Sequence, residues 1–220
     1  MSYIQRSTVL LAFAVVVTAI TASLSGLAAN EKSEPAYGTA EMPETVVAIF
    51  GGGCFWCMER PFDELDGVVD TTSGYIGGAI DKPGYDQVSA GNSGHVEVVQ
   101  VRYDPEQISY DALLEVYWQN VDPLTPNAQF CDSGDQYRSA IFTRGDVQWI
   151  AASQSKQDLQ NSGRFKQDIV TTIENADGVT FWPAEDYHQD YYMKNPIRYK
   201  FYRTSCGRDA RLKELWSDAA

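Results

Sequence analysis

Basic residues, histidine and cysteine are all scarce in this chain. Its 220 residues include 17 Lys and Arg against 30 Asp and Glu, for a formal net charge of -13. Such a surface would repel phosphates, which argues against a nucleic-acid partner. Only two histidines and four cysteines are present. Structural zinc sites commonly draw on paired Cys/His clusters, and a single Cys-x-x-Cys pair occurs here, so we expect no metal site. The chain also lacks a dinucleotide-binding glycine fingerprint, and we expect no cofactor.

Long apolar runs are absent except at the N-terminus. Residues 1–29 combine one early arginine, an apolar run over residues 9–20, and small residues at Ala28 and Ala29. This layout predicts a secretory signal peptide cleaved near Ala29, and therefore an exported, periplasmic protein. An uncleaved membrane anchor is the alternative, although the run is short for a bilayer span. Residues 30–44 predict a flexible leader, and residues 45–216 one globular catalytic domain.

Strand and helix patterns alternate along that domain. Residues 45–53 are β-rich and end in glycines, residues 54–65 have helical spacing, and residues 95–105 alternate with period two. Further on, the patterns predict a helix capped by Ser109, a strand at 139–143, a polar helix at about 146–162 and a strand near 169–174. The intervening segments 79–94 and 122–138 read as long loops. We therefore expect an α+β fold, a two-layer sandwich in which helices pack on a ferredoxin-like mixed β-sheet.

The segment GGGCFWCMER, residues 51–60, contains the Cys-x-x-Cys pair, Cys54 and Cys57. A bridge between residues so close in sequence would restrict the unfolded chain little, so a purely structural disulfide is not favoured. Cys54 follows a predicted strand and glycine turn, at the start of a predicted helix. Backbone N–H groups and the helix dipole favour a thiolate there. A small buried cysteine in a turn is the ordinary alternative. The glycines permit close approach of a substrate, and Cys54 is a candidate nucleophile.

A series of motifs extends this interpretation over residues 45–210. In chain order they are GCFWCME (53–59), GYIGG (74–78), YDQV (85–88), GHVEVV (94–99), YDP (103–105), DQYRSAIF (135–142) and AEDYHQDYYMKNP (184–196). Together they resemble the peptide methionine sulfoxide reductases of the A class. The resemblance implies reduction of methionine S-sulfoxide, free or in oxidised proteins, and recycling by a thioredoxin-like reductant.

The resemblance also assigns roles to residues that carry the reaction. Cys54 corresponds to the nucleophile and would end the first step as a sulfenic acid. Glu97 corresponds to the general acid, and burial by aromatic side chains would raise its pKa enough to hold a proton near neutrality. Tyr85 and Tyr137 correspond to hydroxyl donors to the sulfoxide oxygen.

Three other positions correspond to the pocket of that family. Phe55 and Trp56 match the apolar pocket that receives the substrate's S-methyl group. Asp132 matches a carboxylate that orders the polar side of the site, with Asp135 near enough in sequence for a mistaken register. Glu59, inside the first motif, is interpreted as structural.

The remaining cysteines depart from the common family pattern. Cys57 stands where many members have a small residue, Cys131 directly precedes Asp132, and Cys206 lies in a C-terminal segment without the usual glycine-rich tail. Residues i and i+3 of a helix lie about 5–6 Å apart, within reach of a disulfide. We therefore expect Cys57 to resolve the Cys54 sulfenic acid. Cys206 is the main rival and Cys131 a lesser one.

Two other function classes remain open at this point. A thiol–disulfide oxidoreductase could use Cys54 and Cys57 as its redox pair, although it would leave Glu97, Tyr85 and Tyr137 without a role. An exported binding module could use the aromatic residues to hold methionine-like side chains. For the reductase we expect a monomer.

Overall fold

The computed structural model describes residues 44–217 of the chain. The predicted signal peptide and nearly all of the predicted leader therefore lie outside the described residues. Within residues 44–217, no helix is both long enough and apolar enough to cross a membrane.

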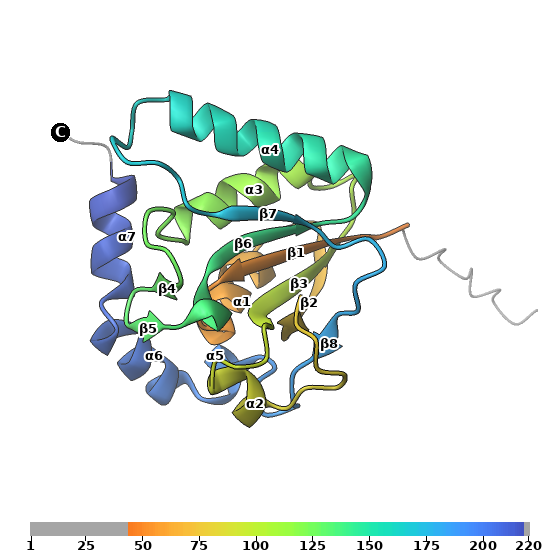
Figure 1. Ribbon diagram of the computed structural model, residues 1–220, viewed down its shortest axis with the longest axis vertical. Coiled ribbons are helices and arrows are strands. Elements are labelled where there is room, and N and C mark those ends of the chain that lie inside the picture. The colour runs from red at the N-terminus through yellow and green to blue at the C-terminus, as the bar shows by residue number, and fades with distance from the viewer. Residues whose placement is uncertain (1–43, 218–220) are drawn as a thin grey trace, which may run out of the picture. The chain divides into compact units, whose positions relative to one another are not determined.

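A six-stranded sheet forms the centre of the fold, with strand order β7-β6-β1-β3-β2-β8 (Figure 1). Its strands are β1 (Val46–Gly52), β2 (Val68–Ile76), β3 (Val96–Tyr103), β6 (Ser139–Thr143), β7 (Thr172–Asn175) and β8 (Trp182–Pro183). Neighbouring strands are antiparallel except β6 and β7, which are parallel. The sheet is therefore mixed, as the sequence predicted.

Seven α-helices accompany the sheet within the described residues. They are α1 (Phe55–Asp63), α2 (Tyr85–Ser89), α3 (Tyr110–Gln119), α4 (Gly145–Asn161), α5 (Tyr191–Lys194), α6 (Pro196–Ser205) and α7 (Arg208–Trp216). The order β1-α1-β2-β3-α3-β6, with β1 and β3 at the centre, is the βαββαβ arrangement of ferredoxin-like folds. The predicted α+β class is confirmed.

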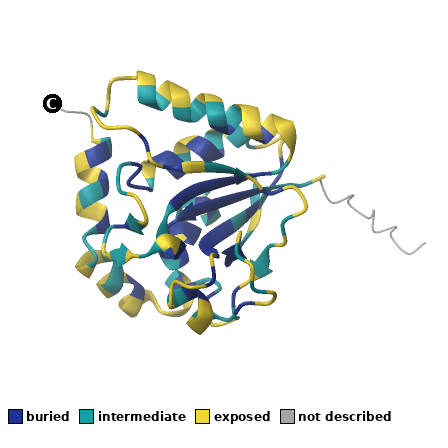
Figure 2. Cartoon of the chain, viewed as in Figure 1, coloured by how far each residue is buried: buried dark blue, intermediate teal, exposed yellow. Residues whose placement is uncertain are grey.

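Alternation along the strands divides the core between the two faces of the sheet. In β1, Phe50 packs with Phe62 of α1 and Tyr117 of α3, whereas its neighbour Ile49 belongs to a separate apolar cluster with Phe142. The strands at the centre are buried along most of their length (Figure 2). This buried sheet holds the ends of β1 and β3 in fixed positions.

The two segments predicted as loops contain short elements. Helix α2 lies within residues 79–94, and residues 122–138 include strands β4 (Ala128–Gln129) and β5 (Asp132–Ser133) and a 3₁₀ helix (Asp135–Tyr137). Elements of two to five residues show too few repeats of any periodicity to be recognised in a sequence. Both segments lead to residues of the site described next.

Candidate active site

The turn between β1 and α1 places Cys54 as the N-cap residue of α1. Two glycines make this turn possible. A Cβ on Gly52 would lie 2.6 Å from Sδ of Met58, and a Cβ on Gly53 would lie 2.5 Å from Cβ of Gln129. Gly53 also has a positive φ of 83°, which favours glycine. Close packing around the turn leaves the Cys54 side chain 7% exposed.

Glu97 reaches the same turn from β3. Its carboxylate accepts a hydrogen bond from the Phe55 N–H, the residue after Cys54, at 3.2 Å. The side chain is 1% exposed, and burial raises the pKa of Glu97 to about 8, although the Phe55 hydrogen bond opposes the shift. Glu97 is therefore mostly protonated at neutral pH and can give a proton to a bound oxygen.

Tyr85 and Tyr137 approach Cys54 and Glu97 from α2 and from the 3₁₀ helix. Both side chains are half-buried. Burial raises the pKa of Tyr85 to about 12, and the charges of Glu97 and Cys54 add to the shift. Burial and the Glu97 charge likewise raise the pKa of Tyr137. Both phenols keep their protons, so each can donate a hydrogen bond to a substrate oxygen.

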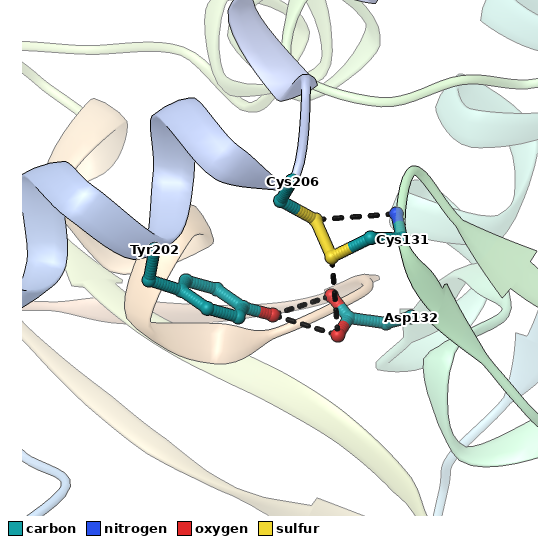
Figure 3. The surroundings of a disulfide bond; sticks show 4 residues. All are labelled: Cys131, Asp132, Tyr202 and Cys206. Atoms are coloured by element: carbon teal, nitrogen blue, oxygen red, sulfur yellow. Dashed lines mark hydrogen bonds between the residues drawn. A yellow bond between two sulfur atoms is a disulfide. The ribbon is translucent and has the colours of Figure 1, made fainter.

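Asp132, in β5, is also close to Cys54 and interacts with its backbone. Its carboxylate accepts hydrogen bonds from the Tyr202 hydroxyl at 2.7 Å to each oxygen (Figure 3). Burial raises the pKa of Asp132, while the Tyr202 hydroxyl, the charge of Arg208 and the backbone of Cys54 oppose the shift. Asp135 is exposed and pairs with Arg138 at 2.9 Å. Of the two aspartates, the structure therefore brings Asp132 and not Asp135 beside Cys54.

The two aromatic residues after Cys54 have different surroundings. Phe55 is 1% exposed, and its ring packs on Tyr75 and His188. Trp56 is half-buried, stacks on Tyr191 with 3.7 Å between ring centroids, and donates its indole N–H to Nδ1 of His188 at 2.9 Å. Trp56 is thus the more accessible aromatic surface for a methyl group, and Phe55 supports it from within.

Glu59 lies deeper, on the face of α1 that packs against β2. It is fully buried, and the Ser73 hydroxyl donates to its carboxylate at 3.4 Å. Burial raises the pKa of Glu59 to about 7, and backbone hydrogen bonds at Asp190 and Tyr191 oppose the rise. These contacts fit the structural role expected of Glu59.

Cys54 and Cys57 are both free thiols and both buried. Burial, the hydrogen bond to Cys57 and the Glu97 charge raise the pKa of Cys54, so the lowering expected at a helix start is overridden. The pKa of Cys57 is lowered to about 7, first by the hydrogen bond from Cys54 and then by the charges of Arg208 and Arg203. The two arginine charges and the hydrogen bond from Cys54 therefore favour ionisation of Cys57, which is partly ionised near neutral pH.

Cys131 and Cys206 form a disulfide, with 5.0 Å between their Cα atoms (Figure 3). The sequence interpretation considered each as a partner for Cys54 and missed this pairing. The two residues are 75 positions apart, and only the fold brings the start of β5 beside the turn between α6 and α7. In this structure Cys206 is already bonded, whereas Cys57 is free and hydrogen-bonded to Cys54.

A model of the family described as peptide methionine sulfoxide reductase matches residues 46–220. The chain belongs to this family. It is 50% identical to peptide methionine sulfoxide reductase MsrA of Streptococcus agalactiae over 169 residues, which are 77% of this chain and 98% of that protein. It is 47% identical to the MsrA of Bacillus licheniformis over 170 residues, or 77% of this chain and 93% of that protein.

Solved reductase structures share the fold. Mxr1 from Saccharomyces cerevisiae in reduced form superposes with a TM-score of 0.64 at 33% identity, covering 70% of this chain and 87% of that chain. Methionine sulfoxide reductase A of Corynebacterium diphtheriae gives a TM-score of 0.62 at 34% identity, covering 71% and 77%. The thiol–disulfide oxidoreductase and binding-module alternatives are therefore set aside.

Two residues of this reductase site were missed by the sequence interpretation. Tyr202 is hydrogen-bonded to Asp132 and also approaches the Cys54 thiol. His188 is 1% exposed, and its ring lies against Phe55, Trp56 and Tyr85. His188 lies within the AEDYHQDYYMKNP motif, and its place in that motif could have identified it as a residue of the site. No pattern in the sequence marks Tyr202, since helix α6 brings it in from the C-terminal segment.

Proposed function

We propose that the chain reduces methionine S-sulfoxide, in oxidised proteins or free, by attack of Cys54 on the sulfoxide sulfur. The observation that carries this proposal is the contact between Glu97 and the backbone of Phe55. It holds a protonated carboxyl beside the nucleophile, where the substrate oxygen would arrive. Tyr85 and Tyr137 supply further donors to that oxygen, and Trp56 supplies the apolar surface for the methyl group.

The first step forms a bond between the Cys54 sulfur and the sulfoxide sulfur. Cys54 passes its proton to the Cys57 thiolate to which it is hydrogen-bonded, and Glu97 protonates the oxygen. The oxygen then passes to the Cys54 sulfur as the substrate's sulfur–oxygen bond and the new sulfur–sulfur bond break, so that methionine leaves and Cys54 is left as a sulfenic acid. The substrate is reduced by two electrons and the cysteine is oxidised by two, so no cofactor is required.

A turnover assay tests this function. The protein is incubated with a methionine sulfoxide peptide and dithiothreitol, and methionine is measured. The wild type should turn over, and Cys54→Ser should not. Disulfide exchange without methionine formation would support the redox-pair alternative, and binding without either reaction would support the binding module.

Cys57 is the residue that closes the disulfide on oxidised Cys54 in this proposal. It is adjacent, hydrogen-bonded and partly ionised near neutral pH, whereas Cys206 is bonded to Cys131. The resulting Cys54–Cys57 disulfide would then be reduced by a thioredoxin-like donor. We extend the proposal to an exported chain with a cleaved signal peptide, on the sequence pattern of residues 1–29 alone. We also propose that the chain is a monomer.

A single-turnover experiment tests the resolving step. Given one equivalent of substrate and no reductant, Cys57→Ser should release about one methionine per chain and accumulate a dimedone-reactive sulfenic acid. It should also lose turnover with thioredoxin. Rapid formation of an intramolecular disulfide in Cys57→Ser, together with loss of turnover in Cys206→Ser, would assign the resolving step to Cys206.

A further inference from the structure

Arg208, the first residue of α7, is a buried charge with an unusual set of partners. Its side chain is 1% exposed. One terminal nitrogen, Nη2, donates to the carbonyl oxygens of Gly52 at 3.1 Å and Asn120 at 2.6 Å, and contacts Sδ of Met58 at 2.8 Å. The guanidinium also lies over the Phe130 ring, 4.4 Å from its centroid. All these partners are uncharged.

No carboxylate within residues 44–217 forms an ion pair with Arg208, and its buried Nε has no hydrogen-bond partner there. Arginine keeps its proton at any physiological pH, and a buried charge is costly unless an opposite charge lies near it. Most buried arginines have a carboxylate for this purpose. The Asp132 carboxylate interacts with the charge of Arg208 without forming an ion pair with it, which leaves room for a further anion beside the guanidinium.

The position of Arg208 indicates which anion that is. Its contacts Gly52 and Met58 lie on either side of the Cys54–Cys57 turn. Its Nη1 lies 3.6 Å from the position that a Cβ on Gly53 would occupy, directly before Cys54. The guanidinium thus packs against the segment that carries both free thiols. Among the groups that interact with its charge, Cys57 acts most strongly and Cys54 also contributes.

We propose that Arg208 is a positioning residue of the reductase cycle, whose buried guanidinium holds the negative charge of the Cys57 thiolate and so prepares Cys57 to attack oxidised Cys54. This inference rests on the proposed role of Cys57 as the resolving cysteine. In this proposal, a charged side chain on α7 assists a reaction between two cysteines at the start of α1.

Within the described part of the chain, no other group that faces Cys57 supplies an unpaired positive charge in place of Arg208. The charged and titratable neighbours are Cys54 on the turn, Glu97 on β3, Asp132 on β5, and Tyr199 and Arg203 on α6. Arg203 also donates to the Cys57 carbonyl, but its charge is already paired with Asp209 at 2.7 Å. The carboxylate of Asp132 opposes ionisation of Cys57. Arg208 is therefore the one unpaired cation among these neighbours.

The step that this charge supports is balanced within the protein. The Cys57 thiolate attacks the sulfur of the Cys54 sulfenic acid, a sulfur–sulfur bond forms, and the sulfur–oxygen bond breaks. The departing hydroxide takes up the proton that Cys57 releases on ionisation and leaves as water. Because Cys57 gains the Cys54 proton in the first step, it must ionise again before it attacks. The fixed positive charge of the Arg208 guanidinium nearby favours that ionisation.

The experiment measures the titration of Cys57 directly. In a Cys54→Ser background, with the Cys131–Cys206 disulfide intact, Cys57 is the single free thiol, and its thiolate is followed by ultraviolet absorbance against pH. Arg208→Met, which keeps side-chain length without charge, should raise the titration midpoint by about one pH unit or more. If the midpoint of the background variant lies near 7, the fraction of thiolate at neutral pH then falls by about fivefold or more.

Arg211→Met is the matched control, because Arg211 is also on α7 and pairs with Asp122 and Glu214 rather than with the thiols. It should leave the midpoint unchanged. A folded Arg208→Met protein with the midpoint of the background variant would overturn the inference. If Arg208→Met does not fold, Arg208→Lys decides. Retention of the midpoint within about half a unit supports a charge effect, and a shift of a full unit despite the retained charge overturns it.

These outcomes can be separated from failure of the proposed function. If Cys57→Ser turns over normally but Arg208→Met shifts the Cys57 titration, the charge assignment holds and the resolving role is wrong. If Cys57→Ser loses turnover but the titration does not move, the resolving role holds and the assignment to Arg208 is wrong.

Discussion

In the proposed mechanism the bound oxygen receives its proton from a single carboxyl group, that of Glu97, which lies in a nearly closed site. Burial raises the pKa of Glu97 to about 8. Its reactive form is the protonated one, so its contribution is present below that pH and is lost as the pH rises through it. The same side chain at a surface would be ionised at neutral pH and unable to act as an acid.

Replacing Glu97 with glutamine keeps the shape of the side chain and removes its titrating proton. We expect Glu97→Gln to slow sulfoxide reduction by about 100-fold or more. The wild-type rate should also fall as the pH rises through about 8, and that decrease should vanish in the variant. Methionine release against pH measures both effects, with alkylation of Cys54 by iodoacetamide as the control for an intact site. A variant that works at the normal rate would remove Glu97 from the mechanism.

At the level of elements, the Cys131–Cys206 disulfide joins the start of β5 to the turn between α6 and α7. Asp132 follows one cysteine in sequence, and Tyr202 and Arg208 flank the other. The bond therefore fixes the relative positions of the segments that bring these three residues to Cys54 and Cys57. It acts as a clamp on one side of the site.

Removing this disulfide should lower the free energy of unfolding more than it lowers the rate of turnover. Cross-links that close loops of this length typically stabilise a domain by about 2–4 kcal/mol. We expect the double variant Cys131→Ala and Cys206→Ala to lose that much free energy of unfolding, measured with urea, while turnover with dithiothreitol persists. Unchanged urea midpoints would show that the disulfide does not contribute to the stability of the fold. Complete loss of turnover in a folded variant would show that the two cysteines belong to the reaction.

Long patterned elements were predictable from the sequence, and sites assembled across the chain were not. Strand β6 occupies residues 139–143 as predicted, and the Ser109 side chain caps α3 as expected. Helix α2 and strands β4 and β5 are too short to leave a pattern. Tyr202 and Arg208 could not be identified, because nothing local distinguishes a tyrosine or arginine on a C-terminal helix from a surface residue. Their roles come from contacts with partners 70 and 156 positions away.

At the level of the whole molecule, the predicted location depends on residues 1–29, which lie outside the described residues. We expect intact-mass measurement of protein purified from its native host to show a chain that starts near Asn30. Export would place its substrates among oxidised proteins of the same compartment. Retention of Met1, together with association with membranes, would instead support the uncleaved anchor.

If the chain is exported, as proposed, the burial of Cys57 has a consequence for the order in which its cysteines are oxidised. Tyr191 and Tyr199, which enclose Cys57, are among the last parts of the chain to be synthesised. Until they pack, all four thiols are open to oxidation, and several pairings compete. The local Cys54–Cys57 pair closes fastest, because a short loop has the smallest entropic barrier. If that pair forms in an oxidising compartment, a reductant is needed before the protein reaches the state described above, in which Cys54 and Cys57 are free thiols.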